Sequence, residues 1–80
     1  MNRDEIFARL TEVFRDIFDD ETLELEETTS PDDIPEWDSL ANISLIAATE
    51  REFGIRFDMK TIKTLKTAGD IADQIGNNLP

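Results

Sequence analysis

Residues 37–54 read WDSLANISLIAATEREFG, and this stretch decides the fold. Its apolar side chains recur at helical spacing, which predicts a helix from about Ser39 to Phe53 that ends at Gly54, with Asp38 capping its first turn. The helix has two apolar stripes, on roughly opposite sides at about 100° per residue. The first stripe consists of Leu45, Ile46, Thr49 and Phe53, and the second of Leu40, Ile43 and Ala47.

A small bundle buries only one stripe of such a helix. The second stripe then has two interpretations. It packs beneath the preceding loop, against Trp37 or Ile34, or it stays exposed as a surface for a partner. The pattern alone supports both interpretations equally.

A first helix is predicted before this stretch by Asn2 and Glu5, which have the spacing of a helix cap and its reciprocal acid. It continues to about Phe18 with its apolar residues inside an arc of about 140°. These residues are Ile6, Phe7, Leu10, Val13, Phe14, Ile17 and Phe18.

Two further helices are predicted after Gly54. Asp58 is placed to cap a brief third helix through about Leu65. Thr67 and Asp70 fit a capping box for a fourth, which we expect to end at Gly76–Asn77. One face of the fourth helix is apolar and consists of Ala68, Ile71, Ala72 and Ile75.

The segment 19–38 carries two prolines and ten acidic residues, counting both ends, and shows no helical period. Four spaced apolar residues could hold it against the bundle, so we interpret it as an ordered crossover rather than a linker. These residues are Leu23, Leu25, Ile34 and Trp37. The fold prediction is therefore all-α: one domain over residues 1–80, a small four-helix bundle with a long ordered loop between helices 1 and 2 and a short helix 3.

The composition restricts the chemistry. The chain has 80 residues, no cysteine and no histidine, and 19 acidic against 8 basic residues, for a net charge of −11. We therefore expect no enzyme, no nucleic-acid binding and no membrane binding. The acidic run 19–21 lacks the turn glycine of an EF-hand loop, so we expect no metal site. A cytoplasmic location is the default expectation, since neither a membrane-length apolar run nor a signal-peptide pattern is present.

Ser39 has three interpretations. An Asp-Ser pair ahead of an apolar helix is a common start signal, which favours a structural role. A serine nucleophile is disfavoured without histidine or a Gly-x-Ser-x-Gly elbow. A modified serine needs only exposure, a rigid platform and a surface that a modifying enzyme can bind. A phosphodiester there would lie at a helix N-terminus, which favours negative charge.

The sequence Trp37-Asp38-Ser39-Leu40 resembles the Asp-Ser-Leu attachment motif of acyl and peptidyl carrier proteins. The amphipathic first helix and the long acidic loop precede the motif as in that family, and Glu50 to Phe57 resembles the end of the family's second helix. Thr67 to Ile75 resembles its last helix, so the resemblance covers essentially the whole chain.

The resemblance implies that Ser39, between Asp38 and Leu40, carries covalent 4′-phosphopantetheine that a phosphopantetheinyl transferase takes from coenzyme A. The terminal thiol of this arm would hold acyl or related intermediates as thioesters. It implies a docking face of Leu40, Ile43, Ala47 and Glu50. It also implies a cargo cavity lined by Leu45, Ile46, Thr49 and Phe53. Expected partners of the monomer are this transferase, an acyl- or aminoacyl-loading ligase, and acyltransferase or synthase enzymes.

Several residues depart from carriers of primary fatty acid synthesis. Ala41 and Ser44 stand where such carriers usually have acids, Arg51 replaces another acid, and the third helix contains Lys60 and Lys63. These departures lead to the hypothesis of a carrier for a dedicated biosynthetic pathway.

Two further hypotheses concern Thr49 and an alternative function. Thr49 on the inward stripe either bonds the preceding helical turn or marks a smaller or more polar cargo. The alternative function is an unmodified helical interaction module that docks through Leu40, Ile43 and Ala47.

Overall fold

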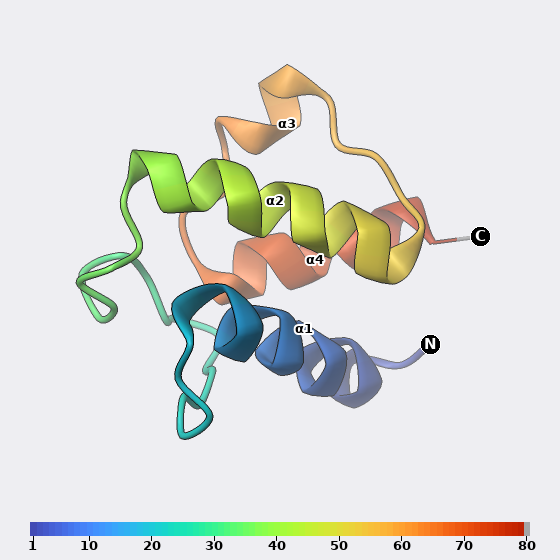
Figure 1. Cartoon of the computed structure of the whole chain (residues 1–80). Coiled ribbons are helices and arrows are strands. Elements are labelled where there is room, and N and C mark those ends of the chain that lie inside the picture. Colours follow the sequence, from blue (N-terminus) through green and yellow to red (C-terminus); the bar gives the residue numbers. More distant parts are fainter. Residues whose placement is uncertain (80) are drawn as a thin grey trace.

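The computed structural model describes residues 1–79, which form helices joined by loops and contain no strand (Figure 1). The helices are α1 (Arg3–Phe18), α2 (Ser39–Phe53), α3 (Met59–Ile62) and α4 (Ala68–Asn78). α1 packs against both α2 and α4. The all-helical prediction with a short third helix is confirmed. None of the described helices has the length and apolarity needed to cross a bilayer.

Local capping defines where each helix starts. The Asn2 side chain accepts from the backbone N–H of Glu5 at 2.9 Å, and Glu5 reciprocates, which completes the predicted capping box. Asp58 accepts from the Thr61 N–H at 2.7 Å at the start of α3. Thr67 is the N-cap of α4 and forms a second complete capping box with Asp70. Each cap satisfies backbone donors that the first helical turn leaves free.

The core lies where α1, α2 and α4 meet. Its most buried large side chains are Leu10, Phe14, Leu45, Thr49, Ile71 and Ile75. Trp37, from the loop before α2, packs its ring edge-to-face on Phe14 at 5.2 Å between centroids. The remaining predicted anchors of the loop also contact this core, with Ile34 buried and Leu23 and Leu25 partly buried.

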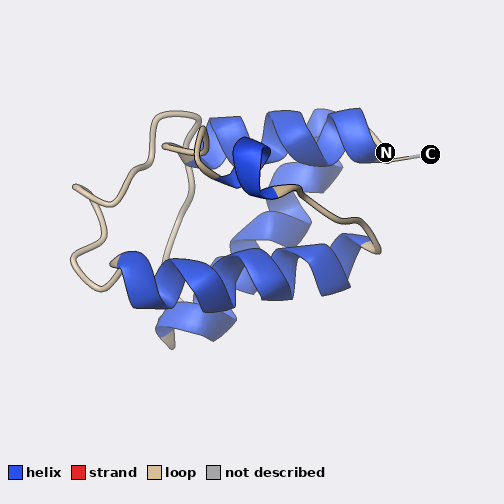
Figure 2. Cartoon of the chain, turned by 90° about the horizontal axis from the view of Figure 1, so that it is seen from above, coloured by secondary structure: helices blue, strands red, loops and turns tan. Residues whose placement is uncertain are grey.

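The long loop between α1 and α2, tan in Figure 2, forms hydrogen bonds with α4 and with α1. The backbone N–H groups of Ala68 and Gly69 donate to the carbonyls of Thr29 and Glu27, at 2.8 and 2.9 Å. On the other side, Arg15 Nε donates to the Leu23 carbonyl at 2.8 Å. These bonds between distant segments give the crossover a fixed path, as predicted.

Two predicted helix ends are wrong. α3 stops at Ile62 rather than near Leu65, because Thr64 and Leu65 instead donate to carbonyls three residues back, in tighter turns. α4 continues through Gly76 to Asn78, since the helix accommodates a glycine there and Leu79 still donates to the Ile75 carbonyl at 3.1 Å. Gly76 therefore lies inside α4 and does not end it.

Candidate functional site

Ser39 is the first residue of α2, and the structure separates its role from that of Asp38. The Asp38 carboxylate caps the helix, with Oδ1 accepting from the Ala41 N–H at 2.8 Å. Ser39 is exposed, and its hydroxyl makes no hydrogen bond with any residue in 1–79. The prediction that Asp38 caps this helix is confirmed, and the Ser39 side chain takes no part in the cap.

The start of α2 offers free donors beside this hydroxyl. The backbone N–H groups of Ser39 and Leu40 have no acceptor within the described part of the chain. Unsatisfied N–H groups and the helix dipole together favour an anion at this end of a helix. The position thus combines an accessible hydroxyl with a backbone that stabilises negative charge next to it.

An open hollow of about 360 Å³ lies next to Ser39. Its lining residues come from the long loop, the start of α2 and the segment after α3. They are Pro31, Trp37, Asp38, Ser39, Asn42 and Leu65. No sequence pattern indicated Pro31, Asn42 or Leu65 as site residues. Asn42 could have been found from its position one turn after Ser39, whereas Pro31 and Leu65 arrive only through the tertiary fold.

The second stripe of α2 is exposed. Leu40 keeps 77% and Ile43 69% of its surface accessible, and Ala47 is half-buried. The interpretation in which the loop covers this stripe is wrong, because Ile34 and Trp37 turn into the core instead. The fourth residue of the predicted docking face, Glu50, is already used in part, since its Oε2 accepts from the Phe57 N–H at 2.8 Å.

The first stripe of α2 lies in the core. Leu45 and Thr49 are fully buried, and Ile46 and Phe53 nearly so. The Thr49 hydroxyl donates to the Leu45 carbonyl at 2.8 Å, as the interpretation based on the preceding turn predicted. None of the four residues lines the hollow beside Ser39. They are packed core residues in this structure.

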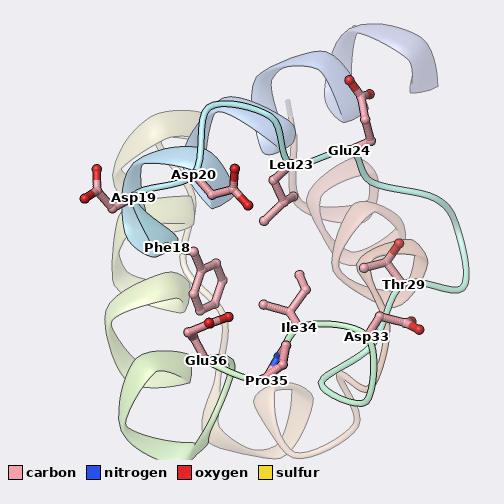
Figure 3. A pocket seen from close by; sticks show the side chains of 10 residues that line it. All are labelled: Phe18, Asp19, Asp20, Leu23, Glu24, Thr29, Asp33, Ile34, Pro35 and Glu36. Carbon is pink, nitrogen blue, oxygen red and sulfur yellow. The ribbon is translucent and has the colours of Figure 1, made fainter.

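A second hollow, of about 450 Å³, lies between the end of α1 and the long loop (Figure 3). Phe18, Leu23 and Ile34 point into it, and five carboxylates stand around it. Hydrogen bonds from the side chain and backbone of Thr22 lower the pKa of one of them, Asp20. The hollow contains none of the predicted site residues, and residues 1–79 hold no group of three side chains placed to bind a metal ion.

Comparison with known proteins gives a consistent result. The family model described as a phosphopantetheine attachment site matches residues 8–75. The acyl carrier protein of Acidothermus cellulolyticus is 31% identical over 77 residues, which cover 96% of this chain and 92% of that protein.

The fold also resembles that of a solved acyl carrier protein. The solution structure of the holo acyl carrier protein from Geobacter metallireducens superposes with a TM-score of 0.84 at 38% identity, over 89% of this chain and 82% of that one. Phosphopantetheine is accordingly the cofactor, and the role is that of a carrier rather than a catalyst. With its capped α2, its free serine hydroxyl and these relatives, the chain belongs to the acyl carrier protein family.

Proposed function

We propose that Ser39 Oγ bears 4′-phosphopantetheine and that the chain presents acyl or related intermediates on this arm to partner enzymes. The observation that carries the proposal is the exposed Ser39 hydroxyl, which has no partner among residues 1–79 because Asp38 caps the helix. When bound, the group supplies the terminal thiol that this cysteine-free chain lacks.

The surroundings of Ser39 fit such a group. A phosphodiester carries negative charge, and the free N–H groups of Ser39 and Leu40 at the α2 N-terminus would stabilise it. The negative charge of the Asp38 carboxylate opposes this stabilisation of the phosphodiester. The carboxylate itself is held at the helix cap, where its Oδ1 accepts from the Ala41 N–H. The adjacent hollow leaves room at the surface for the first part of an arm.

The docking surface in this proposal comprises Leu40, Ile43, Ala47 and Glu50 on α2. Leu40 and Ile43 are two of the few large apolar side chains that the molecule exposes. They follow Ser39 by one and four residues on a rigid helix. An enzyme that binds them would therefore hold the arm at a fixed position relative to its own active site. The proposed partners are a phosphopantetheinyl transferase, an acyl- or aminoacyl-loading ligase, and acyltransferase or synthase enzymes.

We further propose that the chain serves a dedicated biosynthetic pathway rather than general fatty acid synthesis. Ala41 and Ser44 leave the first turns of α2 without acids, apart from the capping Asp38. Basic residues then follow from Arg51 through α3. Efficient loading and elongation by a standard type II fatty acid synthase would contradict this part. We also propose that the protein acts as a monomer in the cytoplasm.

The cargo cavity is proposed along Leu45, Ile46, Thr49 and Phe53. Because these residues pack tightly, an apolar cargo would have to separate them to enter the core. The Thr49 hydroxyl is satisfied by Leu45, so a polar cargo would compete with an existing bond. The variant Thr49→Leu tests its role: unchanged cargo retention would remove Thr49 as a specificity residue.

The decisive experiment is intact mass after incubation with coenzyme A and a broad-specificity phosphopantetheinyl transferase. One added phosphopantetheine on the full chain, absent in Ser39→Ala and retained in Ser44→Ala, is the expected result. Ser44 is the matched control, because it is an exposed serine on the same helix. No addition, with a second transferase giving the same outcome, would favour the unmodified interaction module that docks through Leu40, Ile43 and Ala47.

A further inference from the structure

The charges of this acidic chain are distributed unevenly. Residues 50–66, from the end of α2 through α3, hold five cationic and three acidic side chains. The rest of the chain holds three cationic and 16 acidic side chains. A local reversal of sign therefore lies directly after the proposed docking surface.

The basic residues fall into two groups by their contacts. The three arginines of α1 all form ion pairs. Arg3 pairs with Glu27 and Asp73, and Arg9 pairs with Glu52. Arg15 pairs with Glu12 and Glu24. The five basic residues in 50–66 form no ion pair and no side-chain hydrogen bond within the described residues. They are Arg51, Arg56, Lys60, Lys63 and Lys66, all exposed.

The three acids of the same stretch are already committed to the fold. Glu50 accepts from the Phe57 N–H, and Asp58 caps α3 through the Thr61 N–H. Glu52 pairs with Arg9 on α1 at 2.8 Å. The acids here are thus used internally, while the cations beside them are free to meet charges on another molecule.

A hollow joins these free cations to the docking surface. It has a volume of about 540 Å³, and its lining residues belong to the end of α2 and the turn that follows. Figure 1 shows this turn, where the chain leaves α2 and runs back toward α3. Ala47 and Glu50 of the docking surface line it together with Arg51 and Arg56. Its remaining lining residues are Gly54 and Ile55. The hollow is therefore continuous with the docking surface and has two arginines among its lining residues.

We propose that the docking surface continues across this hollow and α3, and that it receives an acidic segment of a partner enzyme. This inference rests on the proposed function, because it names the chemistry of the partner that meets α2. An apolar side chain of the partner contacts Leu40 and Ile43, while its carboxylates meet the cationic corner, defined as Arg51, Arg56, Lys60 and Lys63. Met59, 69% exposed at the start of α3, adds apolar surface next to Lys60.

The charge pattern makes such a surface selective. The net charge of −11 attracts basic surfaces in general, but salt limits its reach to about 8 Å at physiological ionic strength. At contact distance, the charges nearest to the partner determine whether it binds. A basic partner surface would meet like charge at the corner, and an acidic one would find guanidinium groups suited to bidentate carboxylate contacts. The corner therefore rejects partners that the overall charge would attract.

The test titrates the ¹⁵N-labelled full chain with two synthetic peptides of equal length. One is an amphipathic helix with leucines on one face and glutamates beside them, and the other has lysine at every glutamate position. The double variant Arg51→Gln/Arg56→Gln removes two positive charges from the corner. The control Thr28→Asp/Asn77→Asp makes the same change in net charge at exposed residues of the loop and of α4.

We expect the glutamate peptide to shift the amide signals of residues 40–63. Its dissociation constant should rise about three- to tenfold in Arg51→Gln/Arg56→Gln, as for two lost surface ion pairs, and less than about twofold in the control. Equal weakening in both variants, no binding to residues 40–63, or tighter binding there of the lysine peptide would overturn the inference. Phosphopantetheine addition is measured separately: failure at Ser39 overturns the proposed function, whereas addition without peptide binding overturns only this inference.

Discussion

The indole Nε1–H of Trp37 donates to Oδ1 of Asn42 at 2.9 Å and so joins the end of the long loop to the second turn of α2. The same indole packs edge-to-face on Phe14 of α1. Trp37 therefore links three segments, and the two residues after it are the helix cap and Ser39. The position of Ser39 depends on this side chain as well as on α2.

Trp37→Phe keeps an aromatic ring in the core but removes the donor to Asn42. We expect a loss of about 1–2 kcal/mol in the free energy of unfolding, because a half-buried amide oxygen loses its partner and the smaller ring fills less space. Urea denaturation measures this loss in the free energy of unfolding. A double-mutant cycle with Asn42→Ala isolates the bond, and a coupling energy near zero would contradict the role given to it.

Gly69 lies against the long loop so closely that a side chain would not fit. A Cβ there would come within 2.6 Å of the Glu27 carbonyl oxygen, which also accepts the Gly69 N–H. Gly69→Ala should therefore lower the free energy of unfolding by about 1–3 kcal/mol. The measurement is thermal or urea denaturation.

Gly76→Ala is the matched control in the same helix. A Cβ at this position would meet only Ile6 Cδ1, at 3.9 Å, and alanine favours the helix by up to about 1 kcal/mol over glycine. We expect a slight gain in stability. Destabilisation by both variants to the same extent would mean that the contact with Glu27 is not the cause.

The two stripes of α2 should differ sharply in their contribution to stability. Ile46→Ala removes a buried side chain, 5% exposed, and should cost about 2–4 kcal/mol. Ile43→Ala changes a side chain that is 69% exposed and should stay within about 0.5 kcal/mol of the parent. Equal losses in urea denaturation would show that the second stripe is covered in solution.

The acid sensitivity of the fold should depend on Glu27. A hydrogen bond from the Arg3 guanidinium lowers the pKa of its carboxyl in the folded state. A lowered folded-state pKa contributes stability that is complete above the unfolded-state pKa and is lost as the pH falls through the folded-state value. The difference in Tm between the parent and Glu27→Gln should therefore be largest near pH 7 and shrink below about pH 4.

Glu26→Gln provides the comparison for this pH series. Glu26 is the exposed neighbour of Glu27, and its carboxylate forms no ion pair among residues 1–79. Because Glu26 lacks such a partner, Glu26→Gln should lower the Tm at pH 7 by less than Glu27→Gln does. A Glu27→Gln difference that is constant from pH 7 to pH 3 would contradict the contribution of the ion pair.

The sequence by itself determined the start of every helix. Asn2 with Glu5, Asp38, Asp58, and Thr67 with Asp70 all make the caps that their spacing predicts. Capping joins residues three positions apart, so the local sequence contains the whole interaction. The two stripes of α2 were visible for the same reason, since helical geometry fixes which side chains share a face.

Only the tertiary structure decided which stripe is covered and what Ser39 is free to do. Burial of one α2 face depends on where α1, α4 and the long loop pack, and contacts such as Trp37 on Phe14 join residues distant in the sequence. The ion pairs of α1 likewise reach Glu27, Glu52 and Asp73, whereas the five cations in 50–66 have no ion-pair partner within residues 1–79. Such contacts depend on the packing of whole elements, and no local pattern encodes them.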